Sequence, residues 1–153
     1  MSQPVHAVVM HRFDVPAERV FDACLDPAWV GRWMFGPNVR DERIVRLALE
    51  ARVGGRFSFV VNRAGTEVDH VGEYLEIERP GLLVFTWATR DALPETSRVI
   101  IEITPREQGC DMKLTHVLGA HWSEFVDRAA SSWSQMLDAL ERAIAQEATA
   151  QRG

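Results

Sequence analysis

The chain has 153 residues, of which 46% are hydrophobic and 25% are charged, and its formal net charge is −5. A chain of this length normally forms one domain with a sizeable core, so we expect a single domain over residues 1–147 and a tail over 148–153. Lys113 is the only lysine and the arginines are scattered. This pattern argues against the basic face that nucleic-acid binding requires.

Cys24 and Cys110 are the only cysteines, and neither lies in a C-x-x-C pair. We therefore expect both to be reduced and buried rather than bridged or metal-bound. The N-terminus lacks the charged-then-apolar pattern of a signal peptide, and no apolar run approaches about 18 residues. These features predict a cytoplasmic protein without membrane insertion.

The first quarter of the chain predicts one strand and two short helices. Residues 5–13 fit a strand, and Pro16 suits the first turn of a helix because it needs no N–H partner there. Phe21 and Cys24 share a face of this helix, expected over 17–25. Asp26 and Pro27 then provide a cap and a first turn for a second helix that ends near Trp33.

Between Glu42 and Val117 the hydrophobic period changes to two, which is typical of half-buried strands. Val45, Leu47 and Leu49, for example, alternate with charged or small residues. Turn signals divide the region into expected strands at about 45–49, 57–61, 66–78, 82–89, 97–104 and 110–118. The gaps are too short for crossover helices, so the sheet must be antiparallel.

A long amphipathic helix is expected over residues 123–147. Its apolar residues recur at steps of three and four and are Trp122, Phe125, Val126, Ala129, Trp133, Met136, Leu137, Leu140 and Ile144. A helix this long spans about 37 Å and needs a large apolar surface to lie on. The natural partner is a curved sheet, so we expect an α+β helix-grip fold with about seven strands.

Several segments carry a family resemblance. They are Phe13-Asp14-Val15-Pro16-Ala17-Glu18-Arg19-Val20-Phe21, Arg52-Val53-Gly54-Gly55-Arg56-Phe57, Gly72-Glu73-Tyr74, Val84-Phe85-Thr86-Trp87, Leu114-Thr115-His116 and Trp133-x-x-x-Leu137-x-x-Leu140. Together they resemble the SRPBCC (START-like) superfamily, which includes lipid-transfer domains, polyketide cyclases and Bet-v-type allergens. The closest resemblance is to the bacterial branch similar to the C-terminal domain of activators of heat-shock-protein-90 ATPase. It covers nearly the whole chain and implies the helix-grip fold.

The chain departs from this family pattern at two places. Trp33-Met34 stands where the family often has paired aromatics, and Ser132 stands where it often has a glycine before the tryptophan. Both departures bear on the shape of a cavity and on how closely the helix approaches the sheet.

A straight helix and a concave sheet diverge at one end, which leaves space for an apolar ligand. The expected ligand-binding residues are those on inward parities of the strands and helix: Trp33, Phe57, Phe59, Glu73, Phe85, Trp87, Ile101, Met112, Leu114, His116, Phe125, Trp133 and Met136, with Val99 and Trp122 as further wall candidates. For any single apolar member, plain core is the more common role.

Glu73 and His116 are the candidate catalytic residues if the protein is an enzyme. On residues 66–78, Glu73 shares its parity with Val71 and Ile77, and a carboxylate beside an imidazole could act as acid or base. The alternative, which we favour, is that Glu73 faces solvent and His116 is satisfied near the end of its strand. Tyr74, on the other parity, is then expected at the surface or a sheet edge.

No established catalytic signature is present. The five histidines show no metal-ligand spacing, no G-x-S-x-G occurs, and Gly54-Gly55 lacks the ending of a phosphate loop. We therefore expect no metal and no cofactor.

Three functions remain open: binding of a small hydrophobic ligand, a cyclase- or hydrolase-type enzyme using cavity residues, and an interaction module like the chaperone-ATPase activators. Ligand binding rests on the aromatic-rich inner faces. An interaction module would need an exposed patch, for which the sequence gives no clear stretch. A homodimer through a sheet edge or the helix flank is compatible with all three.

Overall fold

The computed structural model describes residues 3–152. In chain order, it contains β1 (Val5–Phe13), α1 (Ala17–Cys24), α2 (Pro27–Trp33), β2 (Arg43–Leu49), β3 (Arg56–Arg63), β4 (Thr66–Glu78), β5 (Leu82–Thr89), η1 (Arg90–Ala92), β6 (Ser97–Arg106), β7 (Gly109–Leu118), η2 (Ala120–Phe125) and α3 (Val126–Arg152). This order confirms the expected sequence of strand, two short helices, six strands and one long helix.

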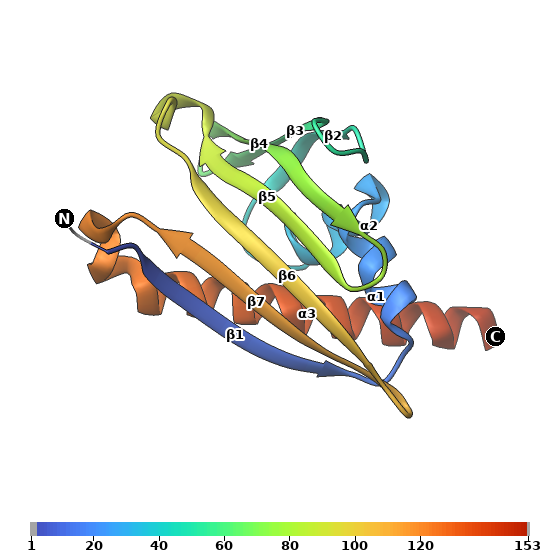
Figure 1. The fold of residues 1–153 in the computed structure, drawn as a ribbon. Coiled ribbons are helices and arrows are strands. Elements are labelled where there is room, and N and C mark those ends of the chain that lie inside the picture. Colours follow the sequence, from blue (N-terminus) through green and yellow to red (C-terminus); the bar gives the residue numbers. More distant parts are fainter. Residues whose placement is uncertain (1–2, 153) are drawn as a thin grey trace.

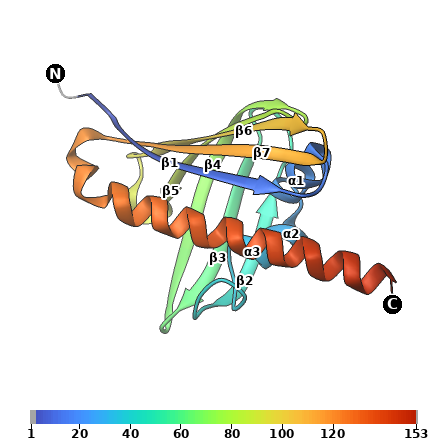
Figure 2. The same ribbon diagram turned by 90° about the horizontal axis from the view of Figure 1, so that it is seen from below.

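The seven strands form one antiparallel sheet in the order β1-β7-β6-β5-β4-β3-β2. Because β1 pairs with β7, the first and last strands of the chain lie side by side (Figure 1). The sheet curves, and α3 runs along its concave side (Figure 2). The helix-grip architecture is therefore confirmed.

Helix α3 packs against the sheet through one apolar face. Trp133, Met136, Leu137, Leu140 and Ile144 are buried on this face, at the spacing that places residues on one side of a helix. The α-helix begins at Val126 rather than at 123, because residues 120–125 form the shorter 3₁₀ turn η2. It also continues through Arg152, so most of the expected tail is helical; Gly153 lies outside the described residues.

The two short helices pack against each other, and α2 also packs against α3. The Asp26 side chain accepts a hydrogen bond from Ala28 N at 3.0 Å, which confirms it as the cap of α2. The Trp33 indole donates to Ala23 O at 3.0 Å, and Arg32 donates to Glu147 and to the Ala143 carbonyl, both at 3.2 Å. These contacts join α1, α2 and α3.

Two β-bulges change which side chains face inward. The first bulge, between Ile44 and Arg46, leaves Val45 46% exposed. The expectation that Val45 lies on the buried side of its strand with Leu47 and Leu49 is therefore wrong. The second, between Tyr74 and Glu76, follows a stretch in which Tyr74 points inward and is 2% exposed. The expectation that Tyr74 lies at the surface is therefore wrong, and desolvation by burial raises its pKa.

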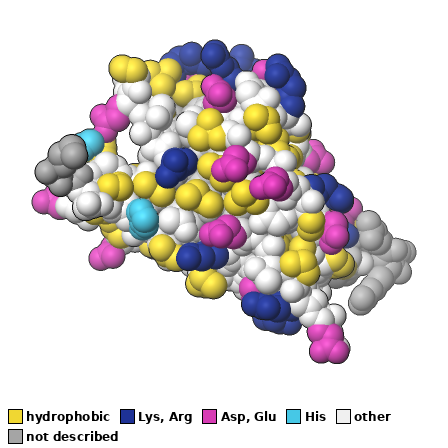
Figure 3. Space-filling view, in the orientation of Figure 1, with side chains coloured by type: hydrophobic (Ala, Val, Ile, Leu, Met, Phe, Trp, Pro, Cys, Tyr) yellow, Lys and Arg dark blue, Asp and Glu magenta, His cyan; other side chains and the backbone are white. Residues whose placement is uncertain are grey.

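The outer face of the sheet, turned away from α3, mixes hydrophobic side chains with charges of both signs (Figure 3). Met10 on β1, for instance, is 65% exposed and lies opposite Lys113, which lies opposite Glu102. Positive and negative side chains are therefore interspersed on this face, so it has no electrostatic potential of a single sign.

The two cysteines, Cys24 and Cys110, are both free and buried, as expected. Among the helices of residues 3–152, none combines the length and the apolar character needed to cross a bilayer.

Candidate functional site

A cavity of about 420 Å³ lies where α3 and the concave face of the sheet diverge. Four of its lining residues come from α3, at the helical spacing of one face: Ala129, Ser132, Trp133 and Met136. The others come from the strands and the loop after α2: Phe35, Arg40, Arg63, His70, Trp87, Thr89 and His116. Its volume lies within the range of small-molecule sites.

A second recess of about 360 Å³ adjoins this cavity. Trp87, Thr89 and His116 line both spaces, and the second extends between the β5–β6 loop and η2. Trp122 lies in its wall. The concave side therefore offers a main cavity and an extension towards the N-terminal end of α3.

Aromatic rings form the apolar wall of the main cavity. The centroids of Trp87 and Trp133 are 5.4 Å apart, and Phe35 stacks on Trp87 at 6.0 Å with an interplanar angle of 12°. Phe35 also meets the His70 ring at 4.5 Å. Rings held in contact with one another form a rigid surface for a flat apolar group.

His116 is held in one tautomer by its neighbours. The Trp133 indole, which can only donate, gives its hydrogen bond to His116 Nδ1 at 3.1 Å. The ring proton must therefore be on Nε2, which donates to Ser97 Oγ at 2.7 Å, and Ser97 donates onward to Trp87 O at 3.0 Å. Desolvation by burial lowers the pKa of His116 from 6.5 to about 4, so the ring is neutral at pH 7.

This hydrogen-bond chain runs in the wrong direction for nucleophilic catalysis. A histidine that activates a serine needs a lone pair on the nitrogen next to the hydroxyl. Here that nitrogen of His116 carries the proton, and the Ser97 proton is committed to a carbonyl oxygen. The arrangement fixes the two side chains in the wall and leaves neither of them activated.

His70 is the second buried histidine of the cavity. It lies opposite Phe59 in the β3–β4 pair, and its Nδ1 bonds the Phe59 carbonyl at 3.2 Å, so Nδ1 carries the proton. Nε2 has no partner among residues 3–152, and this part of the chain holds no fully buried unpaired side-chain N or O atom, so Nε2 opens to the cavity. Desolvation by burial lowers the pKa of His70.

A buried carboxylate and two arginines form the charged edge of the cavity. Glu42 has a fully buried side chain. Its Oε1 accepts from Arg63 Nε and Nη2 at 2.9 and 2.6 Å, and its Oε2 accepts from Arg40 Nη1 at 3.0 Å and Gly36 N at 2.8 Å. Burial raises the pKa of Glu42, but the hydrogen bonds from Gly36 and Arg63 and the charges of both arginines outweigh it and lower it overall.

Only some of the expected ligand-binding residues line this cavity. Trp87, His116, Trp133 and Met136 do so. Phe57, Phe59, Phe85 and Ile101 instead surround an internal void of only about 10 Å³. Four further expected residues lie in the fully buried core: Trp33, Val99, Met112 and Leu114. Phe125 lies on η2 and is 38% exposed.

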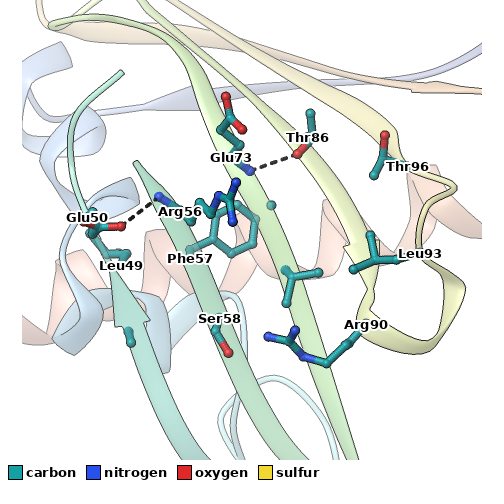
Figure 4. A pocket seen from close by; sticks show the side chains of 13 residues that line it. Leu49, Glu50, Arg56, Phe57, Ser58, Glu73, Thr86, Arg90, Leu93 and Thr96 are labelled. Carbon is teal, nitrogen blue, oxygen red and sulfur yellow. Dashed lines mark hydrogen bonds between the residues drawn. The ribbon is translucent and has the colours of Figure 1, made fainter. Parts of the chain in front are cut away.

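Glu73 lies on the other face of the sheet. It borders an outer groove of about 450 Å³, together with Arg56, Thr86 and Leu93, while α3 passes behind the strands (Figure 4). Its backbone N–H donates to Thr86 Oγ1 at 2.9 Å. The possible pair of Glu73 and His116 is therefore not formed, because the two side chains point to opposite faces; this agrees with the alternative favoured from the sequence.

Sequence reasoning missed Phe35 in the apolar wall and the polar edge of the cavity, which consists of Arg40, Arg63 and His70. The position of His70 follows from the β3–β4 turn, which sets the register of the two strands. Ala64 and Gly65 both have positive φ (54° and 86°), as in a two-residue hairpin turn. That turn places Arg63 opposite Thr66 and hence Phe59 opposite His70.

No group of three or more His, Cys, Asp or Glu side chains able to hold a metal ion occurs in residues 3–152. The polar groups of the cavity are guanidinium donors, one imidazole acceptor and the hydroxyls of Thr89 and Ser132. This set suits hydrogen bonding to an organic molecule.

Comparison with proteins of known structure supports the fold. Protein NE0264 from Nitrosomonas europaea is 18% identical, with a TM-score of 0.81 over 95% of this chain and 97% of that chain. Protein CV1439 from Chromobacterium violaceum is 23% identical, with a TM-score of 0.76 over 90% and 94%. Protein SA2116 from Staphylococcus aureus, described as of unknown function, is 15% identical, with a TM-score of 0.82 over 96% and 97%. These likenesses show a shared fold.

No curated protein matches the chain. A model of the family described as "Activator of Hsp90 ATPase homolog 1-like protein" matches residues 14–145, which is most of the described chain. The chain therefore belongs to the family of Activator of Hsp90 ATPase homolog 1-like proteins.

Proposed function

We propose that this protein binds a small hydrophobic molecule in the cavity between α3 and the sheet. The observation that carries the proposal is the cavity of about 420 Å³ walled by Phe35, Trp87 and Trp133. A preformed apolar wall with a few placed polar groups is the usual form of a small-molecule site. The hydrogen-bond chain of His116 favours binding over turnover, because it leaves neither Ser97 nor His116 activated.

A cavity-filling substitution on α3 tests this proposal. Ser132 lines the cavity, whereas its neighbour Ser131 is exposed on the same helix. N-phenyl-1-naphthylamine, an uncharged fluorescent probe, should bind the native chain and Ser131→Phe saturably. Its affinity for Ser132→Phe should fall at least about tenfold, since the added ring occupies the same space.

Thermal unfolding of each variant serves as the folding control. Equal affinity of the probe for folded Ser131→Phe and Ser132→Phe would show that it binds elsewhere. Absence of saturable binding to the native chain would contradict the proposal as well.

The family description favours a second candidate, an interaction with a chaperone ATPase. Under this reading the protein stimulates ATP hydrolysis by Hsp90. A steady-state ATPase assay with purified Hsp90 tests it, and an unchanged rate at saturating concentrations of this protein would remove it.

A further inference from the structure

The charged residues that line the cavity are all positive. Among its lining residues within 3–152, only Arg40 and Arg63 carry a formal charge at pH 7, because His70 and His116 are buried and neutral. No Asp or Glu lines the space. A ligand in the cavity therefore meets two guanidinium groups and no carboxylate.

Glu42 holds both guanidinium groups in place, but its single negative charge does not cancel their two positive charges. Its four hydrogen bonds from Arg63, Arg40 and Gly36 occupy all four lone-pair positions of the carboxylate. Two positive charges and one negative charge leave a net charge of one positive at this edge. The arginine side chains are 25% and 39% exposed, so the positive charge is accessible rather than sealed in the core.

Each guanidinium keeps donors to spare. Arg63 uses Nε and Nη2 on Glu42, and Arg40 uses Nη1 on Glu42 and on Met34 O. Arg63 Nη1 and Arg40 Nη2 have no acceptor in the part of the chain that the structure describes. Guanidinium N–H groups beside an apolar wall are well placed to bind an oxyanion, because charge-assisted hydrogen bonds strengthen as water is removed.

We propose that the ligand is an organic anion, with an aromatic or similarly flat apolar body against Trp87 and Trp133 and a carboxylate on Arg40 and Arg63. This inference rests on the proposed function and specifies its ligand class. The two requirements come from two groups of lining residues of one cavity, and a neutral hydrophobic molecule would use only one of them.

A matched pair of probes tests the charge requirement. 2-Naphthoate and 2-naphthamide have the same ring and nearly the same size, but only the first is an anion. Isothermal titration of the native chain should show at least about tenfold tighter binding of 2-naphthoate, the effect of one charge-assisted hydrogen bond over a neutral one. Added NaCl should weaken the binding of 2-naphthoate and leave that of 2-naphthamide unchanged.

Substitutions of the arginines test whether Arg40 and Arg63 cause the preference for 2-naphthoate. Arg63→Met, and separately Arg40→Met, should lower the affinity for 2-naphthoate about tenfold and change that for 2-naphthamide less than about threefold. Arg98→Met, on the outer face of β6, removes an exposed arginine and should leave both affinities as in the native chain.

The outcomes separate this inference from the proposed function. Equal binding of the two probes to the native chain, or a 2-naphthoate preference that survives both cavity variants, overturns the anion inference and leaves ligand binding intact. Binding of neither probe contradicts the proposed function itself. If a variant does not fold, the probe preference and its salt dependence in the native chain decide the matter.

Discussion

His116 is a buried histidine in the wall of the cavity. Its neutral ring is bonded at both nitrogens, to Trp133 and to Ser97, and burial lowers its pKa to about 4. In the unfolded chain the pKa returns to about 6.5, so the unfolded chain binds one more proton between these two values. The free energy of unfolding should therefore fall as the pH falls from 6.5 towards 4.

The expected size of this effect is about 3 kcal/mol at its limit, because one pKa unit corresponds to about 1.4 kcal/mol. His116→Gln can keep both hydrogen bonds without titrating, so its stability should depend less on pH in this window. Urea denaturation at pH 5 and pH 7 measures the difference, and His6→Gln, on the exposed face of β1, is the matched control. A slope in His116→Gln equal to the native one would contradict the burial of a neutral ring.

Single-residue orientation was the least predictable feature of the sequence. Val71 and Ile77 on β4 share a parity with Glu73, which leaves an inward Glu73 possible beside the favoured alternative that it faces solvent. The bulge after Tyr74 breaks this parity, so that Ile77 pairs with inward Leu83 while Glu73 faces out. Local hydrophobicity alone does not reveal a bulge.

The ion cluster of Glu42 with Arg40 and Arg63 was equally hidden. These residues come from a loop and from the end of β3, and nothing in their spacing indicates that they meet. The β2–β3 pairing, in which Arg43 lies opposite Asn62, brings Glu42 beside Arg63.

At the scale of elements, a polar contact joins the β5–β6 loop to η2. The Glu95 carboxylate accepts hydrogen bonds from His121 Nε2 and Trp122 Nε1, both at 2.6 Å, and we call this contact the Glu95 latch. The hydrogen bonds from Trp122 and His121 lower the pKa of Glu95. Since Glu95, His121 and Trp122 all border the second recess, the latch forms part of its wall.

Glu95→Ala should free these segments without unfolding the domain. We expect faster amide hydrogen exchange in residues 92–96 and 119–123, because exposed loops held by few contacts open locally. The melting temperature should stay within about 2 °C of the native value. Asp91→Ala, an exposed acidic residue of η1, is the control, and unchanged exchange in Glu95→Ala would show that the latch does not restrain the loop.

Element boundaries were far more predictable than side-chain orientations. β1, β4 and β5 match their expected bounds, because Pro, Gly and Asn-rich turns delimit them. The start of α3 was missed by three residues, since Trp122 and Phe125 continue the helical period into the 3₁₀ turn η2. Periodicity does not distinguish the first turns of a helix from a 3₁₀ segment before it.

At the scale of the whole molecule, the fold and the proposed function meet in the cavity between α3 and the sheet, which we propose that a ligand fills. The fold follows from the alternation of strand residues and the stripe on α3. The polar edge depends on the loop after α2 and on the end of β3, and it distinguishes this cavity from a plain hydrophobic one.

The five tryptophans provide the most direct test of that claim. Their indole N–H signals in a ¹H–¹⁵N NMR spectrum report on separate places: Trp87 and Trp133 line the main cavity, Trp122 lies in the second recess, and Trp29 and Trp33 lie on α2. Titration with uncharged 2-naphthamide should shift the signals of Trp87 and Trp133 and leave those of Trp29 and Trp33 in place. Saturable binding that leaves Trp87 and Trp133 unmoved would contradict a ligand site between α3 and the sheet.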